Sequence, residues 1–421
     1  MQSFWLGRKG DALATESTCN EAQDESKGES TSILKVSRSI GFDDSSDASY
    51  HGEKDARLID WTTEVLTGFL EKIVSRRLEA QRRPSAHPKP PFEESSNILE
   101  EFTPIIALPP FDPEAAMNCG DCPFKVPSEV NFQLRVFVAT IASLYRRENS
   151  FHNFEHATHV LMSATKLIRR IVSHDHIDGK HITDKCEKRR CLEAHHLSTL
   201  GISSDPLAQF AIIFSALIHD VEHPGVANVT LIDEESKLAM KYKNKSVAEQ
   251  NSVEVAWGIL MQEQFAELRH CVFSTSEERG RFRQLVVNSV LATDIMDRDL
   301  QDLRKNRWAK AFSPEESMPT NTNEDVNRKA TIVIEHIIQA SDVAHTMQHW
   351  HVYTRWNERL FNEMYVAYLH GRCEKDPSKG WYEGKIILPP INASSLRDSS
   401  QLCAQFSRRD GILRFLRYSF G

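Results

Sequence analysis

The stretch FAIIFSALIHDVEHPG, residues 210–225, decides which fold this chain is expected to adopt. Its first nine residues are apolar on every side, which is typical of a helix buried at the centre of a helical bundle. The apolar run ends in His219 and Asp220, and His223 with a Pro-Gly pair follows, which predicts that the helix stops there. A histidine and an aspartate at the end of a buried helix lose hydration at a large cost unless they gain a partner. A divalent metal ion is the usual partner.

The regions on both sides of this stretch also carry helical patterns. Apolar side chains recur every three or four residues over 134–145 and again over 160–171. A further apolar run, TIVIEHIIQASD over residues 331–342, ends in Asp342, which is another potential ligand. Alternating patterns typical of strands are scarce. The sequence therefore predicts an all-α fold, a bundle of many helices in which several helices end in polar residues.

The composition of the 421 residues is that of an ordinary soluble protein, with 40% hydrophobic and 26% charged residues. The net charge of −8 argues against a nucleic-acid partner. No apolar run approaches the ~18 residues of a membrane helix, and no signal peptide is recognisable. Of the eight cysteines, only Cys119 and Cys122 have C-x-x-C spacing, without the second pair of a zinc site. We therefore expect free thiols and a cytoplasmic location.

Changes in composition along the chain predict five segments. The first is rich in serine and acidic residues and is expected to be disordered, and the second has the apolar spacing of one amphipathic helix. In order they are a disordered N-terminal segment (1–57), a connector helix (58–80), a proline-rich linker (81–130), a main helical domain (131–385) and an atypical C-terminal tail (386–421).

The stretch FHNFEHATHV, residues 151–160, contains three histidines. On a helix His152 and His156 lie four residues apart and share a face, and His159 could share it too. Spacing alone does not decide which of them binds a metal, which does chemistry and which packs. A second histidine-rich stretch, residues 173–206, lacks regular ligand spacing, so we expect a long solvated loop there.

A competing interpretation concerns HDVEH, residues 219–223, which fits the H-x-x-E-H pattern of inverted zinc proteases. His219 and His223 would be the ligands and Glu222 the general base. That chemistry needs a helix that continues through both histidines, whereas the Pro-Gly pair stops the helix at once. It would also leave the histidines of 151–160 without a role, so we do not favour it.

The order of the motifs H-N-x-x-H, H-D-x-x-H-P-G and a lone aspartate after an apolar helix resembles the class I 3′,5′-cyclic-nucleotide phosphodiesterases of the HD superfamily. Three further stretches carry the resemblance, SVAEQNS (246–252), VLATD (290–294) and GWYEG (380–384). The chain resembles protist members more than animal ones, because EQNS stands where animals commonly have a Glu-Asn-His-His run. The resemblance extends over residues 131–385 and implies a multi-helix bundle of the HD type.

The resemblance also implies roles for the residues that match these motifs. His152 would be the general acid. The protein ligands of the first metal ion would be His156, His219, Asp220 and Asp342. The residues that orient metal-bound water and the phosphate would be His223, Asn228, Glu249 and Asp294. Asn153 would support the acid, and His159 matches no functional position.

The implied chemistry needs two divalent ions. Two imidazoles and two carboxylates suit zinc at the first position, and Asp220 as a bridge to a second ion that keeps its waters suits magnesium or manganese. Ions ~3.5–4 Å apart would activate a water that attacks phosphorus in line, while protonated His152 gives its proton to the departing O3′. The expected substrate is cyclic AMP, cyclic GMP or both, and the expected product is a nucleoside 5′-monophosphate. A homodimer is compatible with the resemblance.

Both ends of the sequence depart from the family pattern. After Lys385 the family's purine-binding glutamine and clamping phenylalanine have no counterpart, so we expect metal binding with weak or absent activity that does not distinguish the bases. The alternatives are a metal-binding but catalytically impaired regulatory module, and an HD-type hydrolase of another phosphate ester. MQSFWL (1–6) is similar to the closing residues of class III nucleotide cyclase domains. It suggests a piece of a cyclase–phosphodiesterase fusion, with membrane association only in that context.

Overall fold

The computed structural model describes residues 46–81, 98–118, 124–173, 184–312 and 322–372. Several sequence predictions fall outside these ranges, namely those for the cyclase-like start, the C-x-x-C pair, the GWYEG stretch and the C-terminal tail. Regular structure in the described ranges is helical and includes no strand, which confirms the all-α prediction. None of the helices found there is both long enough and apolar enough to cross a bilayer.

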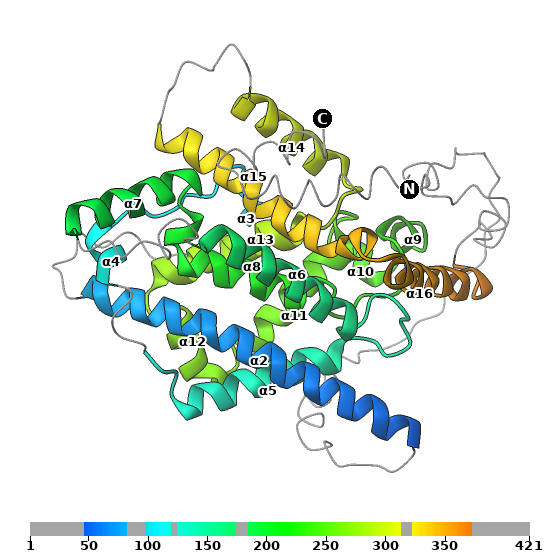
Figure 1. Ribbon diagram of the computed structural model, residues 1–421. Helices are drawn as coiled ribbons and strands as arrows, with labels where there is room; N and C mark the ends of the chain where they lie inside the picture. Colours follow the sequence, from blue (N-terminus) through cyan, green and yellow to red (C-terminus); the bar gives the residue numbers. More distant parts are fainter. Residues whose placement is uncertain (1–45, 82–97, 119–123, 174–183, 313–321, 373–421) are drawn as a thin grey trace.

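The helices pack around one main hydrophobic core (Figure 1). In chain order they are α2 (Ser46–Gln81), α3 (Ile98–Glu101), α4 (Pro113–Asn118), α5 (Ser128–Leu144), α6 (Phe154–Val172), α7 (Lys185–Ser198), η1 (Ile202–Ser204), α8 (Pro206–Ile218), α9 (Asn228–Asp233), α10 (Lys237–Lys241), α11 (Val247–Leu260), η2 (Glu263–Phe265), α12 (Ala266–Val272), α13 (Ser276–Leu291), α14 (Arg298–Phe312), α15 (Asn323–Asp342), η3 (Ala344–Met347) and α16 (Trp350–Leu369).

Helix α8 forms the centre of this core, as the apolar stretch predicted. Asp205 caps its N-terminus by accepting a hydrogen bond from the N–H of Ala208, and Pro206 stands in the first turn, where no helical hydrogen bond is lost. Every residue from Leu207 to Ile218 is buried, and α6, α13, α2 and α15 pack around the helix (Figure 1). Because this burial removes apolar surface from water, it fixes the position of α8 in the bundle. The positions of His219 and Asp220, which directly follow the helix, are fixed with it.

Helix α2 begins earlier than the sequence predicted. It spans Ser46–Gln81, whereas the connector helix was expected over 58–80 and the residues before it were expected to be disordered. The prediction is wrong for residues 46–57, because a low apolar content does not prevent a helix whose charged residues find partners on other elements. Lys54, for example, pairs with Glu155 of α6 at 2.6 Å. Figure 1 shows α2 crossing the bundle with its first turns projecting from it.

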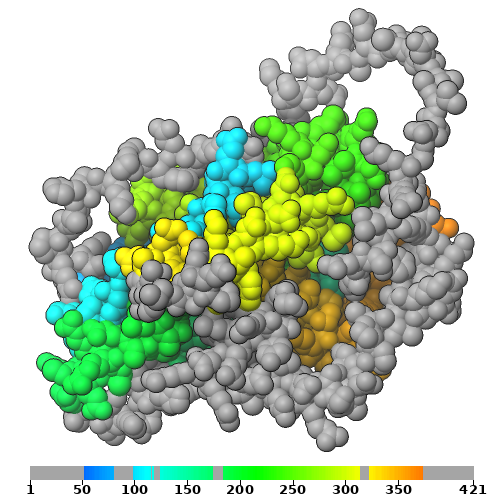
Figure 2. Space-filling view, turned by 90° about the horizontal axis from the view of Figure 1, so that it is seen from above, coloured from blue at the N-terminus to red at the C-terminus, as the bar shows by residue number. Residues whose placement is uncertain are grey.

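The prediction of a proline-rich linker (81–130) is also wrong for part of the stretch that the structure describes. Residues 98–108 pack into the bundle, and Figure 2 shows their cyan surface beside the yellow surface of α14 and α15. Ile106 is fully buried and its N–H donates to Oγ1 of Thr331 at 2.8 Å. Arg307 donates to a backbone carbonyl of the same segment at 2.7 Å. Such partners lie some 200 residues away in sequence, so composition could not reveal them.

Residues 185–198 form helix α7, where a solvated loop was expected. The side chain of Asp184 accepts a hydrogen bond from the N–H of Cys186 and so caps the helix. Lysine, arginine, glutamate, leucine and alanine make up most of the segment, and these residues favour helices. None of its residues is buried, so α7 is regular but remains a solvated element.

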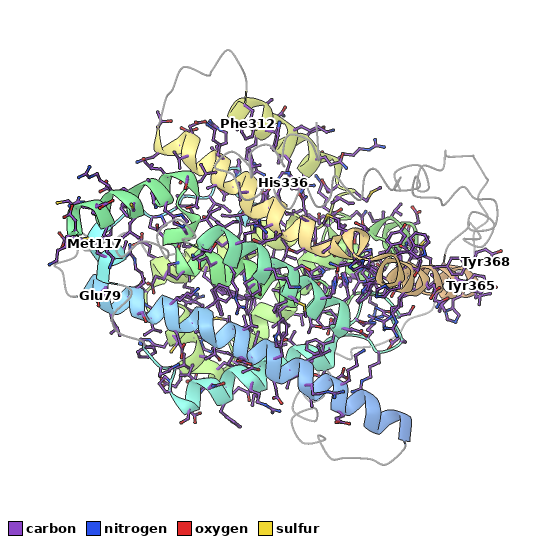
Figure 3. The ribbon with its side chains drawn as sticks, viewed as in Figure 1. Glu79, Met117, Phe312, His336, Tyr365 and Tyr368 are labelled. Atoms are coloured by element: carbon purple, nitrogen blue, oxygen red, sulfur yellow. The ribbon has the colours of Figure 1, made fainter. Side chains whose placement is uncertain are left out.

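One side of helix α16 packs near the N-terminal end of α6. In Figure 3 its far end, where Tyr365 and Tyr368 are labelled, extends away from the other helices. The buried positions of the helix include Tyr353, Trp356 and Glu363, which recur at helical spacing. A glutamate therefore occupies a position on the buried face of α16.

Candidate functional site

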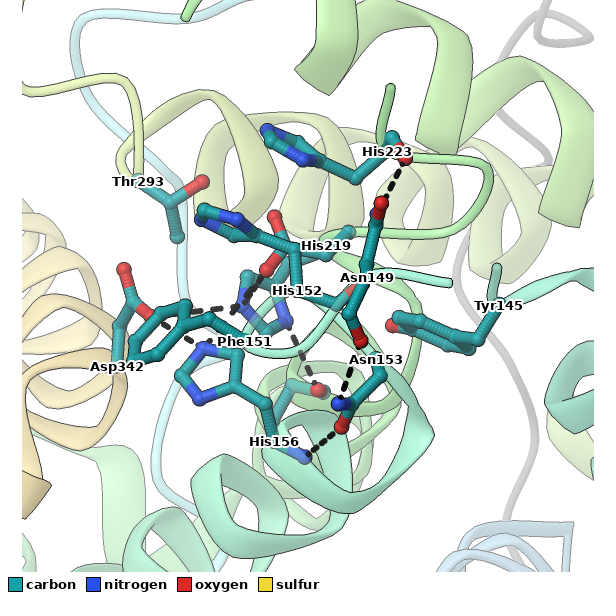
Figure 4. Close-up of polar contacts among 12 residues, drawn as sticks. Tyr145, Asn149, Phe151, His152, Asn153, His156, His219, His223, Thr293 and Asp342 are labelled. Atoms are coloured by element: carbon teal, nitrogen blue, oxygen red, sulfur yellow. Dashed lines mark hydrogen bonds and ion pairs between the residues drawn. The ribbon is translucent and has the colours of Figure 1, made fainter. Parts of the chain in front are cut away.

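Three helices bring the four predicted metal ligands to one place. His156 lies in the first turn of α6, His219 and Asp220 follow α8, and Asp342 ends α15. Nε2 of His156 lies 3.0 Å from Oδ1 of Asp342 and 3.7 Å from Oδ2 of Asp220. Nε2 of His219 lies 3.1 Å from the same Asp220 oxygen and 3.5 Å from that of Asp342. His156, His219 and Asp342 thus each offer one ligand atom within 4.8 Å of the other two, so that they could hold one metal ion (Figure 4), and Asp220 lies beside both histidines.

The surroundings of these side chains fit a divalent metal ion. His156 and His219 are each 1% exposed, and the buried Nε2 of His219 faces the carboxylates of Asp220 and Asp342. Nδ1 of His219 donates to the carbonyl of Ala216 at 3.1 Å, so in the neutral ring the lone pair is on Nε2. Burial lowers the pKa of His219, but the carboxylates of Asp220 and Asp342 outweigh it and raise this pKa well above its ordinary value. The two carboxylates therefore favour positive charge at Nε2 of His219, where a metal ion could take the place of a proton.

A second polar group consists of two acidic residues, Glu249 and Asp294, and the amide of Asn228 between them. Nδ2 of Asn228 donates to Oε2 of Glu249 at 2.8 Å and to Oδ2 of Asp294 at 3.4 Å. Its Oδ1 accepts the N–H of Ala248 at 3.0 Å, which fixes the amide orientation. Burial and the charge of Asp294 raise the pKa of Glu249 to about 8, and the charge of Asp220 adds to this. A cation near these carboxylates would relieve their repulsion, as a second, hydrated ion would.

His152 and Glu363 form a pair beside the predicted ligands. Nδ1 of His152 hydrogen-bonds Oε1 of Glu363. Oε2 of the same carboxylate accepts the backbone N–H of Phe151 at 2.8 Å and that of His152 at 3.0 Å. Burial lowers the pKa of His152, but the Glu363 hydrogen bond and the charge of Asp220 outweigh it and raise this pKa above its ordinary value. The Glu363 carboxylate thus favours the protonated form of His152, which is the form that a general acid needs.

The ring of His223 stacks on that of His152, with centroids 3.9 Å apart. Burial and the charge of His152 lower the pKa of His223 to about 3. Nδ2 of Asn149 donates to the backbone carbonyls of both histidines, at 3.1 Å to His152 and 2.8 Å to His223 (Figure 4). Gly225 approaches the same side chain with φ +73°, and a Cβ at this position would lie 2.7 Å from Oδ1 of Asn149. The H-P-G turn therefore needs its glycine.

The zinc-protease interpretation fails on backbone geometry. Helix α8 ends at Ile218, before the HDVEH stretch, and Glu222 within that stretch has φ +59°. Its carboxylate accepts a hydrogen bond from Nδ2 of Asn251 at 3.2 Å. The helix that would hold both imidazoles of H-x-x-E-H does not exist in this described stretch.

Asn153 and His159 have local roles. Oδ1 of Asn153 accepts the N–H of His156 at 3.1 Å and caps α6, while its Nδ2 donates to the carbonyl of Asn149 at 2.9 Å. The asparagine of H-N-x-x-H thereby joins the loop that carries His152 to the helix that carries His156. The ring of His159 is half-buried and lies 5.4 Å from that of Trp356. It packs against this ring, in keeping with its lack of a match to any functional position of the family.

Sequence reasoning missed Glu363 and Asn149. The signal for Glu363 was present, since a lone glutamate interrupts the apolar face of the helix over 350–369. A charged residue at a buried position must be paired, but the sequence does not say with which partner. Asn149 carried no signal, because an asparagine before a helix is an ordinary turn residue.

Comparisons with known proteins agree with the motif analysis. Residues 151–372, slightly more than half of the chain, match the model of the family described as 3′5′-cyclic nucleotide phosphodiesterase. This range includes every predicted site residue and excludes α2. Among curated relatives, the 3′,5′-cyclic-nucleotide phosphodiesterase regA of Dictyostelium discoideum is 23% identical over 58% of this chain and 25% of its own length. The mouse 3′,5′-cyclic-AMP phosphodiesterase 4C is 26% identical over 58% of this chain and 30% of its own length.

The chain thus spans about a quarter to a third of the length of these relatives. Solved structures overlap with it only loosely. The phosphodiesterase domain of the Salpingoeca rosetta rhodopsin phosphodiesterase gives a TM-score of 0.45 at 18% identity, covering 68% of this chain and 78% of that one. The structure of LmjPDEB1 in complex with IBMX gives 0.42 at 20% identity, covering 56% and 59%.

Proposed function

Because this chain belongs to the 3′5′-cyclic nucleotide phosphodiesterase family, we propose that it hydrolyses 3′,5′-cyclic nucleotides to nucleoside 5′-monophosphates with the help of divalent metal ions. We base the proposal on one observation, the grouping of His156, His219 and Asp342 beside the His152–Glu363 pair. A set of ligands next to a protonated histidine is what metal-assisted cleavage of a phosphate ester requires.

The residues present suit two ions. His156, His219, Asp220 and Asp342 would hold the first, and two nitrogens with two carboxylates favour zinc. Asp220 would also face a second ion, for which the carboxylate-rich surroundings of Glu249 and Asp294 favour magnesium or manganese. When bound, such ions supply positive charge that stabilises the phosphate oxygens and acidifies water.

The protein side chains would carry out proton transfer and orient the substrate and water. His152 gives its proton to O3′ as the P–O3′ bond breaks and the oxygen of a water adds to phosphorus. Glu363 holds Nδ1 of that ring, so the proton delivered comes from Nε2. His223 is neutral because burial and the charge of His152 lower its pKa to about 3. Its Nδ1 accepts the N–H of Gly225, so its Nε2–H is the group that can donate a hydrogen bond to a water or a phosphate oxygen. Asn228 holds Glu249 and Asp294 together by hydrogen bonds, and these two side chains would orient the waters of the second ion.

The decisive experiment is an assay of the purified chain with cyclic AMP and cyclic GMP, each with and without chelator. Formation of 5′-monophosphate that stops on chelation and is slowed by His152→Ala supports the proposal. Metal binding without hydrolysis of either substrate would favour the catalytically impaired module. Turnover only of another phosphate ester would favour the other HD-type hydrolase.

We extend the proposal to location and assembly. The acidic net charge and scattered cysteines are consistent with action in the cytoplasm. A homodimer remains our expectation from the family, and light scattering of the purified chain would test it. Fractionation of the cells that express the chain would test the location.

A further inference from the structure

We propose that helix α2 positions the loop that carries His152 through an ion cluster of Lys54, Glu155 and Arg359, and that Glu155 is a positioning residue of the reaction. The family-matched residues begin at 151, so α2 lies outside them. Only the kinetic consequence rests on the function proposed above, because the contacts themselves can be tested without any substrate.

The cluster joins three helices at a single carboxylate oxygen. Nζ of Lys54 on α2 lies 2.6 Å from Oε2 of Glu155, and Nη1 of Arg359 on α16 lies 2.9 Å from the same oxygen. Burial raises the pKa of Glu155, but its two cationic partners outweigh this and lower it overall, so the carboxylate is charged at neutral pH. Glu155 directly precedes His156, so a change in its position moves the first turn of α6.

Helix α16 carries the contact on to the acid. Arg359 and Glu363 lie one turn apart on this helix, and both form polar contacts with residues of the segment 150–155. The hydroxyl of Ser150 donates to the carbonyl of Arg359 at 2.9 Å, and Glu363 accepts the backbone N–H groups of Phe151 and His152. The guanidinium of Arg359 lies 4.8 Å from the ring centre of Trp356, which restricts where the arginine can go. Releasing Arg359 from Glu155 should therefore loosen the carboxylate that holds the acid.

Helix α2 can act as the fixed end of this chain of contacts. Leu66 and Leu70 in its middle are fully buried. At its other end Arg77 donates to the carbonyls of His270 and Val272, each at 3.1 Å. Lys54 is therefore carried by a helix that is anchored in its middle and at its other end.

The expected effect is modest because the three side chains are each about a quarter to a third exposed. Ion pairs of this kind contribute little, and breaking one should change a local equilibrium by about two- to fivefold. Removing Glu155 breaks both pairs, so its effect should exceed that of removing Lys54 alone.

The test measures amide hydrogen exchange at Phe151 and His152, the two N–H groups that Glu363 accepts. Lys54→Met and Glu155→Gln are compared with wild type and with Asp60→Asn. Asp60 is a matched control because it is another charged residue of α2 and pairs with Arg135 of α5 at 2.7 Å. Exchange within the later turns of α6 reports any general loosening.

We expect exchange at both positions to rise about two- to fivefold in Lys54→Met and more in Glu155→Gln, with no rise in Asp60→Asn. Lys54→Met should add nothing in the Glu155→Gln background. In active protein kcat should fall by a similar factor while KM and metal content hold. Unchanged exchange at Phe151 and His152, or an equal rise throughout α6, would overturn the proposal. A wild-type chain that hydrolyses neither cyclic nucleotide would refute the proposed function, and the exchange data would still decide this inference.

Discussion

Replacing Glu363 by glutamine should change the protonation of His152, the proposed general acid, without changing the position of its loop. In the structure one carboxylate oxygen accepts two backbone N–H groups and the other faces Nδ1 of His152. A glutamine can keep its oxygen on the backbone side, so the loop should hold its place. Its NH₂ group then meets Nδ1 of His152, and two donors cannot share one hydrogen bond. The variant therefore favours a neutral ring with Nδ1 unprotonated.

The size of the effect follows from the bond that is lost. A hydrogen bond between charged partners contributes about 1.5–3 kcal/mol, so its loss should slow turnover by about 10- to 150-fold. The pKa of His152 is raised in the wild type, where burial is opposed by Glu363 and by the charges of Asp220 and Asp342, with His223 stacked on the ring. Without the Glu363 charge that pKa falls. The limb of the pH–rate profile at which activity is lost with rising pH should therefore move to lower pH.

The assay is a set of kcat and kcat/KM profiles against pH at saturating metal, with zinc and magnesium content measured for each protein. Glu358→Gln is the matched control, since Glu358 is an exposed glutamate on the same helix. It should change neither rate nor profile. If Glu363→Gln retains wild-type kcat and an unshifted profile, the pair does not set the protonation of His152. If it loses the metals, Glu363 acts on the ligands instead.

Three further predictions use simpler readouts. Asp220→Ala should lose both ions in elemental analysis, because Asp220 is the only proposed bridge between them, and full occupancy of both would contradict this. His152→Ala should retain the metals yet slow turnover by about 10²–10⁴, whereas loss of the first metal would make His152 a ligand. Gly225→Ala should lower the free energy of unfolding by about 1–3 kcal/mol or more, because a Cβ would meet Oδ1 of Asn149. Gly371 also has a positive φ, but a Cβ there would meet no atom within 4 Å. Gly371→Ala should therefore lower the melting temperature less than Gly225→Ala does.

The sequence predicted the parts of the fold that depend on local patterns. The apolar run of α8 fixed a buried helix, and the motifs around it led to the residues that the structure groups together. It could not predict partners that lie far apart in the chain. Thr331 accepts the N–H of Ile106 across 225 positions, so a stretch that composition assigned to a linker is part of the core. Lys54 and Glu155, about a hundred positions apart, likewise form an ion pair between two helices, although composition assigned the segment of Lys54 to disorder.

The sequence also does not reveal which of the two stacked histidines, His152 or His223, carries a proton. His152 and His223 stand in similar motifs, and nothing in either motif says which one carries a proton. Two unit charges about 4 Å apart repel by about 4 kcal/mol at the effective dielectric of a partly buried site, so the pair cannot easily hold two protons. The proton therefore belongs to the ring that gains more from it. Glu363 contacts His152, while Nδ1 of His223 accepts the N–H of Gly225 at 3.2 Å, a bond that a protonated ring could not accept. The assignment of the acid thus depends on a glutamate 211 positions away and on a backbone turn, and neither is visible in the motif itself.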